Sequence, residues 1–225
     1  MRANFPYRFA IIGFLLFSFF EAEAQQLWTS IEANYKATKK WKFSLEESYR
    51  TNDYLEEWRI LFTEVGAKRE LTDYLDVGAS YRFTTVHRKN NEHRITGELK
   101  LKTDVFDSDW KVDYRFKYQY EWKVGETNEL LAYRNRFGIQ YKLEDEFQPY
   151  ASYEHFYIPE DRDDIKYRIK FGIETELSKE LKLDVCYLYQ RSFFQAQEFG
   201  DEPKHSSAIK LALSYTFKRK SSANN

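Results

Sequence analysis

Segments in which apolar and polar residues alternate run along most of the chain, and tight turns about 35 residues apart separate pairs of these segments. In the clearest segment, Trp110 to Trp122, every even-numbered residue is apolar or aromatic and every odd-numbered residue is polar or charged. Because successive side chains of a strand point to opposite faces, this pattern predicts a β-strand with one apolar and one polar face. Its 13 residues are many for a soluble strand but suit a strand that crosses a bilayer at a tilt.

The connections between the segments are alternately short and long, and the longer ones are polar and charged. Short periplasmic turns and longer extracellular loops are typical of outer-membrane barrels. We therefore predict an all-β fold, an antiparallel up-and-down transmembrane β-barrel. The predicted strands are 27–35, 41–51, 58–71, 74–86, 92–106, 110–122, 130–143, 147–157, 165–177, 181–193 and 205–217.

The number of predicted strands poses a problem, because bacterial single-chain barrels have an even number. If the chain ends on the periplasmic side, segment 27–35 would begin outside the cell. Either this segment is not a full strand of the wall and lies in the lumen or on the periplasmic rim, or one strand has been missed. We expect about 10–12 strands.

The first 24 residues have the features of a secretory signal peptide. Arg2 and Arg8 provide a basic start, an apolar stretch covers 9–20, and Ala22-Glu23-Ala24 is a small-x-small cleavage site. We expect cleavage before Gln25, which leaves a single barrel domain at 25–225 that ends in a polar tail at 218–225.

Composition agrees with a barrel in a membrane. Aromatic residues make up 19% of the chain and charged residues 32%, and the two classes alternate residue by residue. The mean hydropathy is −0.74, and no run after the signal peptide approaches the apolar length of a transmembrane helix, which excludes a helical membrane protein. In a transmembrane barrel the aromatic side chains face lipid and the charged side chains line the lumen.

The last predicted strand also fits a bacterial outer membrane. Lys210 to Phe217 alternates polar or small residues with apolar ones and ends in two aromatic residues, Tyr215 and Phe217. This arrangement resembles the C-terminal signal that the barrel-insertion machinery reads. We expect that machinery and outer-membrane lipid to be partners, and the cell outer membrane to be the location.

Short motifs in four of the predicted strands give the chain a resemblance to a known family. The motifs are Arg134-Asn-Arg136, Gln148-Pro-Tyr150, Lys166-Tyr-Arg168 and Tyr187-Leu-Tyr-Gln-Arg191. It resembles the domain of unknown function numbered 2490, a family of predicted outer-membrane β-barrels found largely in Bacteroidetes. The resemblance covers Leu27 to Phe217 and implies fold and location, but no activity.

A Tyr-Arg pair recurs in five strands, and the predicted register places each Tyr toward lipid and each Arg toward the lumen. Four of these arginines are expected near the extracellular mouth, where their planar donor groups suit carboxylate or phosphate. The lumen residues predicted to contact a small anionic ligand are Arg50, Arg82, Arg115, Arg134, Arg136, Arg168, Glu46 and Glu154.

Charge in the predicted lumen supports two hypotheses. The inward positions hold 17 basic and 9 acidic residues by this register. An anion-preferring pore or small-ligand transporter explains the excess. A closed structural or partner-binding barrel, filled by a network of salt bridges, explains the mixture of charges.

An enzyme is the third hypothesis. The four histidines fall at or near the long loops, and His205-Ser206-Ser207 places a histidine and a serine on one face of a strand. A nucleophilic serine needs a base within hydrogen-bond reach, which makes His155, His205 and Ser207 the candidate catalytic residues of an outer-leaflet lipid-modifying hydrolase. No zinc-ligand spacing, glycine-rich phosphate loop or nucleic-acid-binding pattern occurs, so we expect no metal, cofactor or nucleic acid.

Overall fold

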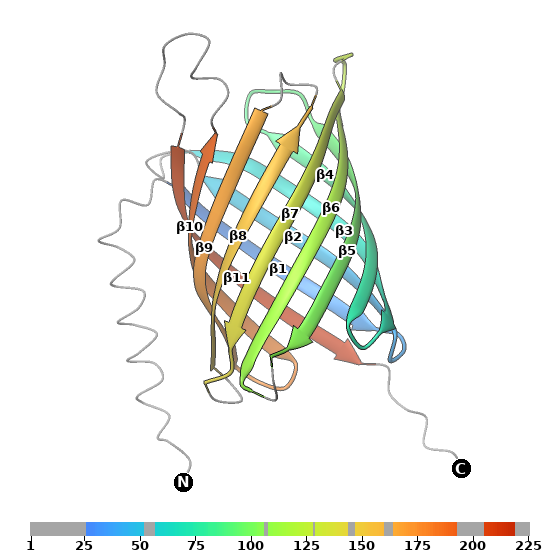
Figure 1. Cartoon of the computed structure of the whole chain (residues 1–225). Helices are drawn as coiled ribbons and strands as arrows, with labels where there is room; N and C mark the ends of the chain where they lie inside the picture. The colour runs from blue at the N-terminus through green and yellow to red at the C-terminus, as the bar shows by residue number, and fades with distance from the viewer. Residues whose placement is uncertain are drawn as a thin grey trace.

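A computed structural model describes residues 26–51, 57–105, 108–127, 129–143, 147–159, 164–192 and 205–218. The predicted signal peptide and the end of the polar tail lie outside these residues. The described residues form eleven strands that close into one barrel (Figure 1). The strands are β1 (Gln26–Lys36), β2 (Trp41–Thr51), β3 (Trp58–Thr72), β4 (Leu75–Val86), β5 (Glu92–Asp104), β6 (Trp110–Lys123), β7 (Glu129–Tyr141), β8 (Phe147–Ile158), β9 (Asp164–Glu176), β10 (Leu181–Ser192) and β11 (His205–Lys218).

The predicted all-β barrel is thus confirmed, and each predicted strand agrees with the structure to within two residues at either end. Consecutive strands from β1 to β11 pair antiparallel. None of the described residues forms a helix long and apolar enough to cross a membrane.

The first strand corrects one expectation, because segment 27–35 is a full strand of the wall rather than a lumen or rim segment. β1 pairs antiparallel with β2 and parallel with β11, in a register that runs from Gln26 opposite Ala208 to Lys36 opposite Lys218. An odd number of alternating strands leaves the first and last strands pointing the same way. The barrel therefore closes through one parallel pair.

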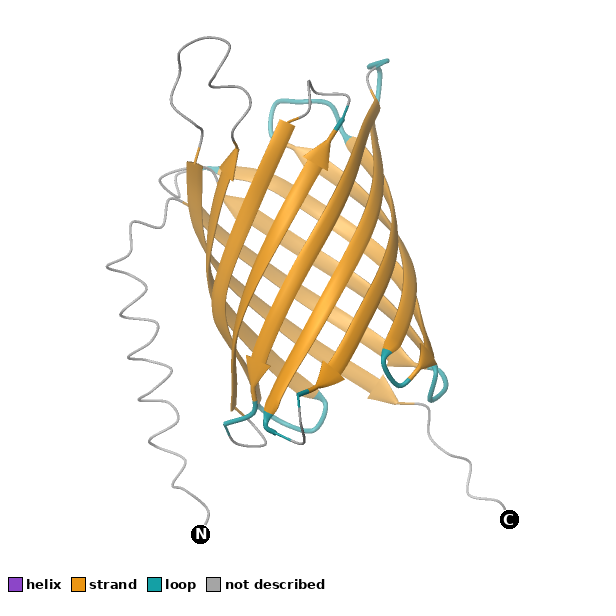
Figure 2. Ribbon diagram, viewed as in Figure 1, coloured by secondary structure: helices purple, strands orange, loops and turns teal. Residues whose placement is uncertain are grey.

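Turn chemistry explains the short connections at one end of the barrel (Figure 2). The Thr38 hydroxyl accepts hydrogen bonds from the backbone N–H groups of Lys40 and Trp41, at 3.2 and 3.0 Å. The Ser178 hydroxyl does the same for Glu180 and Leu181, at 3.3 and 3.1 Å. Such local bonds stabilise the reversal of the chain and fix the register of the hairpin. We call this end the short-turn end and the opposite one the long-loop end.

The two faces of the wall differ as the alternation predicts. Large apolar side chains are exposed on the outside, including Ile31, Phe137 and Phe171 with 66%, 58% and 57% of their surface accessible. Buried polar side chains point inward, among them Gln119 and Glu154. A barrel that exposes its apolar surface and buries its charge is built for lipid outside and polar contents inside.

Candidate functional site: the basic lumen

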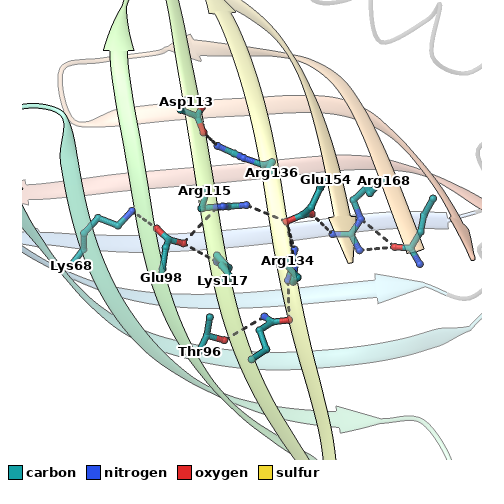
Figure 3. Close-up of polar contacts among 12 residues, drawn as sticks. Lys68, Thr96, Glu98, Asp113, Arg115, Lys117, Arg134, Arg136, Glu154 and Arg168 are labelled. Carbon is teal, nitrogen blue, oxygen red and sulfur yellow. Dashed lines mark hydrogen bonds and ion pairs between the residues drawn. The ribbon is translucent and has the colours of Figure 1, made fainter. Parts of the chain in front are cut away.

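Buried charge in the lumen is organised around two carboxylates. Glu154 on β8 has 1% of its surface exposed and lies 2.7 Å from Arg134 Nη2, 3.4 Å from Arg168 Nη1 and 3.6 Å from Arg115 Nη2. Three guanidiniums around one carboxylate leave local positive charge in excess. These arginines come from β7, β9 and β6, so that the group joins four neighbouring strands (Figure 3).

Glu98 on β5 is the second of these carboxylates. It lies 2.9 Å from Lys68 Nζ, 3.0 Å from Lys117 Nζ and 3.8 Å from Arg115 Nη1. Arg115 contacts both carboxylates and connects the two groups. The result is a chain of alternating charges along the inner wall from β3 to β9, visible in Figure 3.

Further ion pairs join neighbouring strands. Arg82 pairs with Glu64 at 2.6 Å, and Arg94 pairs with Glu121. Nearer the short-turn end Arg136 pairs with Asp113. Pairing of this kind neutralises charges along the inner wall, as the structural-network hypothesis predicts.

The lumen also contains a cavity of about 360 Å³, to which every one of the eleven strands contributes. Its volume falls at the lower end of the range of small-molecule sites. Two acidic side chains, of Glu46 and Glu121, face ten basic ones in its lining. The ten are Arg50, Arg82, Arg94, Arg115, Arg134, Arg168, Lys117, Lys166, Lys170 and Lys210.

Of the predicted lumen residues, Arg50, Arg82, Arg115, Arg134, Arg168 and Glu46 line this cavity. Glu154 is not part of the lining but contacts three of the lining arginines. Arg136 is absent from the lining because it sits closer to the short-turn end, paired with Asp113. Tyr49 and Tyr81, which precede Arg50 and Arg82, have 42% and 39% of their surface accessible. These tyrosines therefore face outward, as the predicted register requires.

Three aromatic rings of the lumen were not expected from the sequence. The guanidinium carbon of Arg50 lies 4.0 Å from the Trp28 ring centroid, that of Arg82 3.7 Å from the Phe62 centroid, and that of Arg134 4.4 Å from the Phe156 centroid. Such cation–π contacts hold an arginine in place without a carboxylate.

Two of these rings could have been predicted from the strand register. Phe62 and Phe156 are two residues away from the inward Glu64 and Glu154 on the same strands, so they point to the same face. Residue type alone places aromatic residues on the lipid face. Two further lumen charges, Glu64 and Lys68 on β3, are not among the lumen residues named from the sequence.

The candidate catalytic residues lie on the outer wall and not in the cavity. His155 on β8 is opposite Tyr167 on β9, and His205 on β11 stacks on Tyr189 with 6.4 Å between ring centroids. Three strand spacings, about 14 Å, separate the strands of His155 and His205. Ser207 is buried opposite Tyr189. The structure therefore places His155 far from the other two.

Among the described residues, no group of three or more His, Cys, Asp or Glu side chains has an arrangement that could hold a metal ion.

Comparison with solved structures finds the same fold in porins. The NanC porin is 13% identical over 87% of this chain and 95% of its own, with a TM-score of 0.56. The KdgM porin is 14% identical over 85% and 91%, with a TM-score of 0.48. At this identity the likeness to the NanC porin shows the fold alone. No curated protein matches the chain.

The family model described as "Protein of unknown function (DUF2490)" matches residues 25–200, which is most of the barrel. The order and spacing of the strand motifs, the closed barrel and this match agree. The chain belongs to the DUF2490 family.

Proposed function

We propose that the protein is a narrow, anion-preferring pore or small-ligand transporter of the outer membrane, exported by cleavage before Gln25. The observation that carries the proposal is the cavity lined by ten basic and two acidic side chains. Walls of low dielectric constant focus the field of such a charge excess, which attracts anions and repels cations.

Incomplete pairing of the inward charges favours this proposal over a closed structural barrel. A barrel whose charges serve only stability should neutralise them. Among the described residues, no hydrogen bond or ion pair reaches the guanidinium of Arg50 or the ammonium of Lys170, although both line the cavity. Holding a charge away from a neutralising partner costs stability, and a role for that charge in attracting anions accounts for it.

The experiment uses vesicles that contain the refolded barrel and either a chloride-sensitive or a potassium-sensitive dye. Lys170→Gln removes a cavity charge without leaving a carboxylate unpaired, unlike changes at Arg134 or Arg168, which contact Glu154. Lys111→Gln is the matched control, because Lys111 is exposed at the short-turn end and absent from the cavity lining.

Wild-type barrel should admit chloride faster than potassium, Lys170→Gln should lower this preference, and Lys111→Gln should leave it unchanged. Equal chloride entry with and without folded barrel would refute the proposal. So would a preference that Lys111→Gln lowers as much as Lys170→Gln does.

A further inference from the structure

One arginine in the cavity has no acceptor for its donor groups. The Nε–H of Arg50 is buried without a hydrogen-bond partner, and its guanidinium rests on Trp28 at 4.0 Å and on Phe62 at 5.1 Å. A buried donor without an acceptor is costly, which makes it a site where an arriving acceptor gains binding energy.

Electrostatics around Arg50 point to the same kind of ligand. The charged groups that act most strongly on it are the guanidiniums of Arg82, Arg168 and Arg94, followed by the carboxylate of Glu46. Arg168 also approaches the Trp28 ring, with its guanidinium carbon 5.4 Å from the centroid. Arg50 and Arg168 thus meet at the same ring, where β1 closes the barrel.

The cavity as a whole keeps more than one uncompensated positive charge. Ten basic side chains line it, and one of them, Lys166, is left out of the charge count because it takes part in a further interaction. Nine basic side chains remain. Against them stand Glu46 and Glu121 in the lining and four carboxylates that contact these bases from outside it. These four belong to Glu64, Glu98, Glu154 and Asp184. Three positive charges remain, more than one chloride ion neutralises.

We propose that Arg50, with Arg168 beside Trp28, is the binding site for a multiply charged oxyanion, of the charge and size of sulfate or a phosphate group. The Nε–H of Arg50 has no acceptor, and Arg168, which donates to Gln190 and Glu154, keeps a second N–H on each of Nη1 and Nη2. Planar guanidinium donors suit the several oxygens of an oxyanion better than a halide. A cavity of about 360 Å³ holds such an anion with several water molecules. The inference deepens the proposed function, since it rests on the lumen's being open to anions.

Tryptophan fluorescence provides the test. The chain has five tryptophans, all within the described residues, and Trp28 alone lines the cavity. Sulfate is titrated into the refolded barrel in detergent at constant ionic strength, and the same titration of Trp28→Phe is subtracted. The difference signal should change and saturate for the wild-type barrel. A wild-type difference signal that does not change, or does not saturate, overturns the inference.

Arg50→Gln should weaken sulfate binding about tenfold or more, the range expected for loss of charged hydrogen bonds. Arg50→Lys keeps the charge without the planar donors and should lie between wild type and Arg50→Gln. If Arg50→Gln does not fold, Arg50→Lys still decides the matter. Lys111→Gln should bind sulfate within twofold of wild type. Equal affinity of the Arg50 variants and wild type overturns the inference.

This experiment separates the inference from the proposed function, because binding in detergent does not need conduction. Sulfate binding that depends on Arg50 in a barrel that passes no chloride would support the site and refute the pore. Chloride passage without saturable sulfate binding would do the reverse.

Discussion

Removing the negative charge of Glu154 should destabilise the barrel while raising its preference for anions. Glu154→Gln keeps the shape and one oxygen acceptor but leaves three guanidiniums, at 2.7, 3.4 and 3.6 Å, without their shared counter-charge. At an effective dielectric constant of 20, each contact at such distances amounts to about 5–6 kcal/mol before desolvation is subtracted. Breaking a buried pair by removing one partner costs about 3–5 kcal/mol net, and we expect the free energy of unfolding to fall by about 3 kcal/mol.

The assay is equilibrium unfolding in urea of the barrel folded into lipid vesicles. Glu126→Gln is the control, since Glu126 pairs with Lys123 at 3.6 Å in an exposed connection where 36% and 41% of the two side chains are accessible. An exposed pair contributes less than about 1 kcal/mol. A loss below 1 kcal/mol for Glu154→Gln, equal to that of the control, would refute the view that the guanidinium cluster depends on this carboxylate.

Two further predictions concern the wall. Gly172→Ala should lower the free energy of unfolding by about 1–3 kcal/mol, the usual cost of overpacking, because its Cβ would clash with the Cβ of Cys186 and lie 2.8 Å from the Tyr150 ring carbon that bears the hydroxyl. Gly97→Ala, with no atom within 4 Å of the added Cβ, serves as the control in the same urea assay, and equal losses for the two would contradict the contact. In a variant without the native cysteine, Ser30→Cys with Ala212→Cys should form a disulfide under oxidation, because the two residues are parallel neighbours on β1 and β11. No cross-link in the folded barrel on non-reducing gels would contradict the parallel closure.

Alternation allowed the fold to be predicted from the sequence, because a barrel in lipid needs one apolar and one polar face on every strand. The run from Trp110 to Trp122 shows this, since β6 ends one residue beyond it. The place of β1 was not predictable in the same way. Whether a strand joins the wall depends on its partner, and the parallel pairing with β11 is a long-range contact that no local pattern encodes.

The lumen was predictable in part for the same reason. Parity placed Arg50, Arg134 and Glu154 inward, but it gave no distances between strands. Which cations share Glu154, and which have no counter-charge, depends on the shear of the barrel. Residue type misled for Trp28 and Phe156, because rings that pack on guanidiniums serve the polar interior.

The measurement that tests the central claim most directly is the single-channel current of the refolded barrel in a planar bilayer under a KCl gradient. Steady unitary currents with a reversal potential shifted toward the chloride equilibrium potential are predicted, because the cavity lining holds ten basic and two acidic side chains. A reversal potential on the potassium side, or a correctly folded barrel that passes no current, would contradict the account.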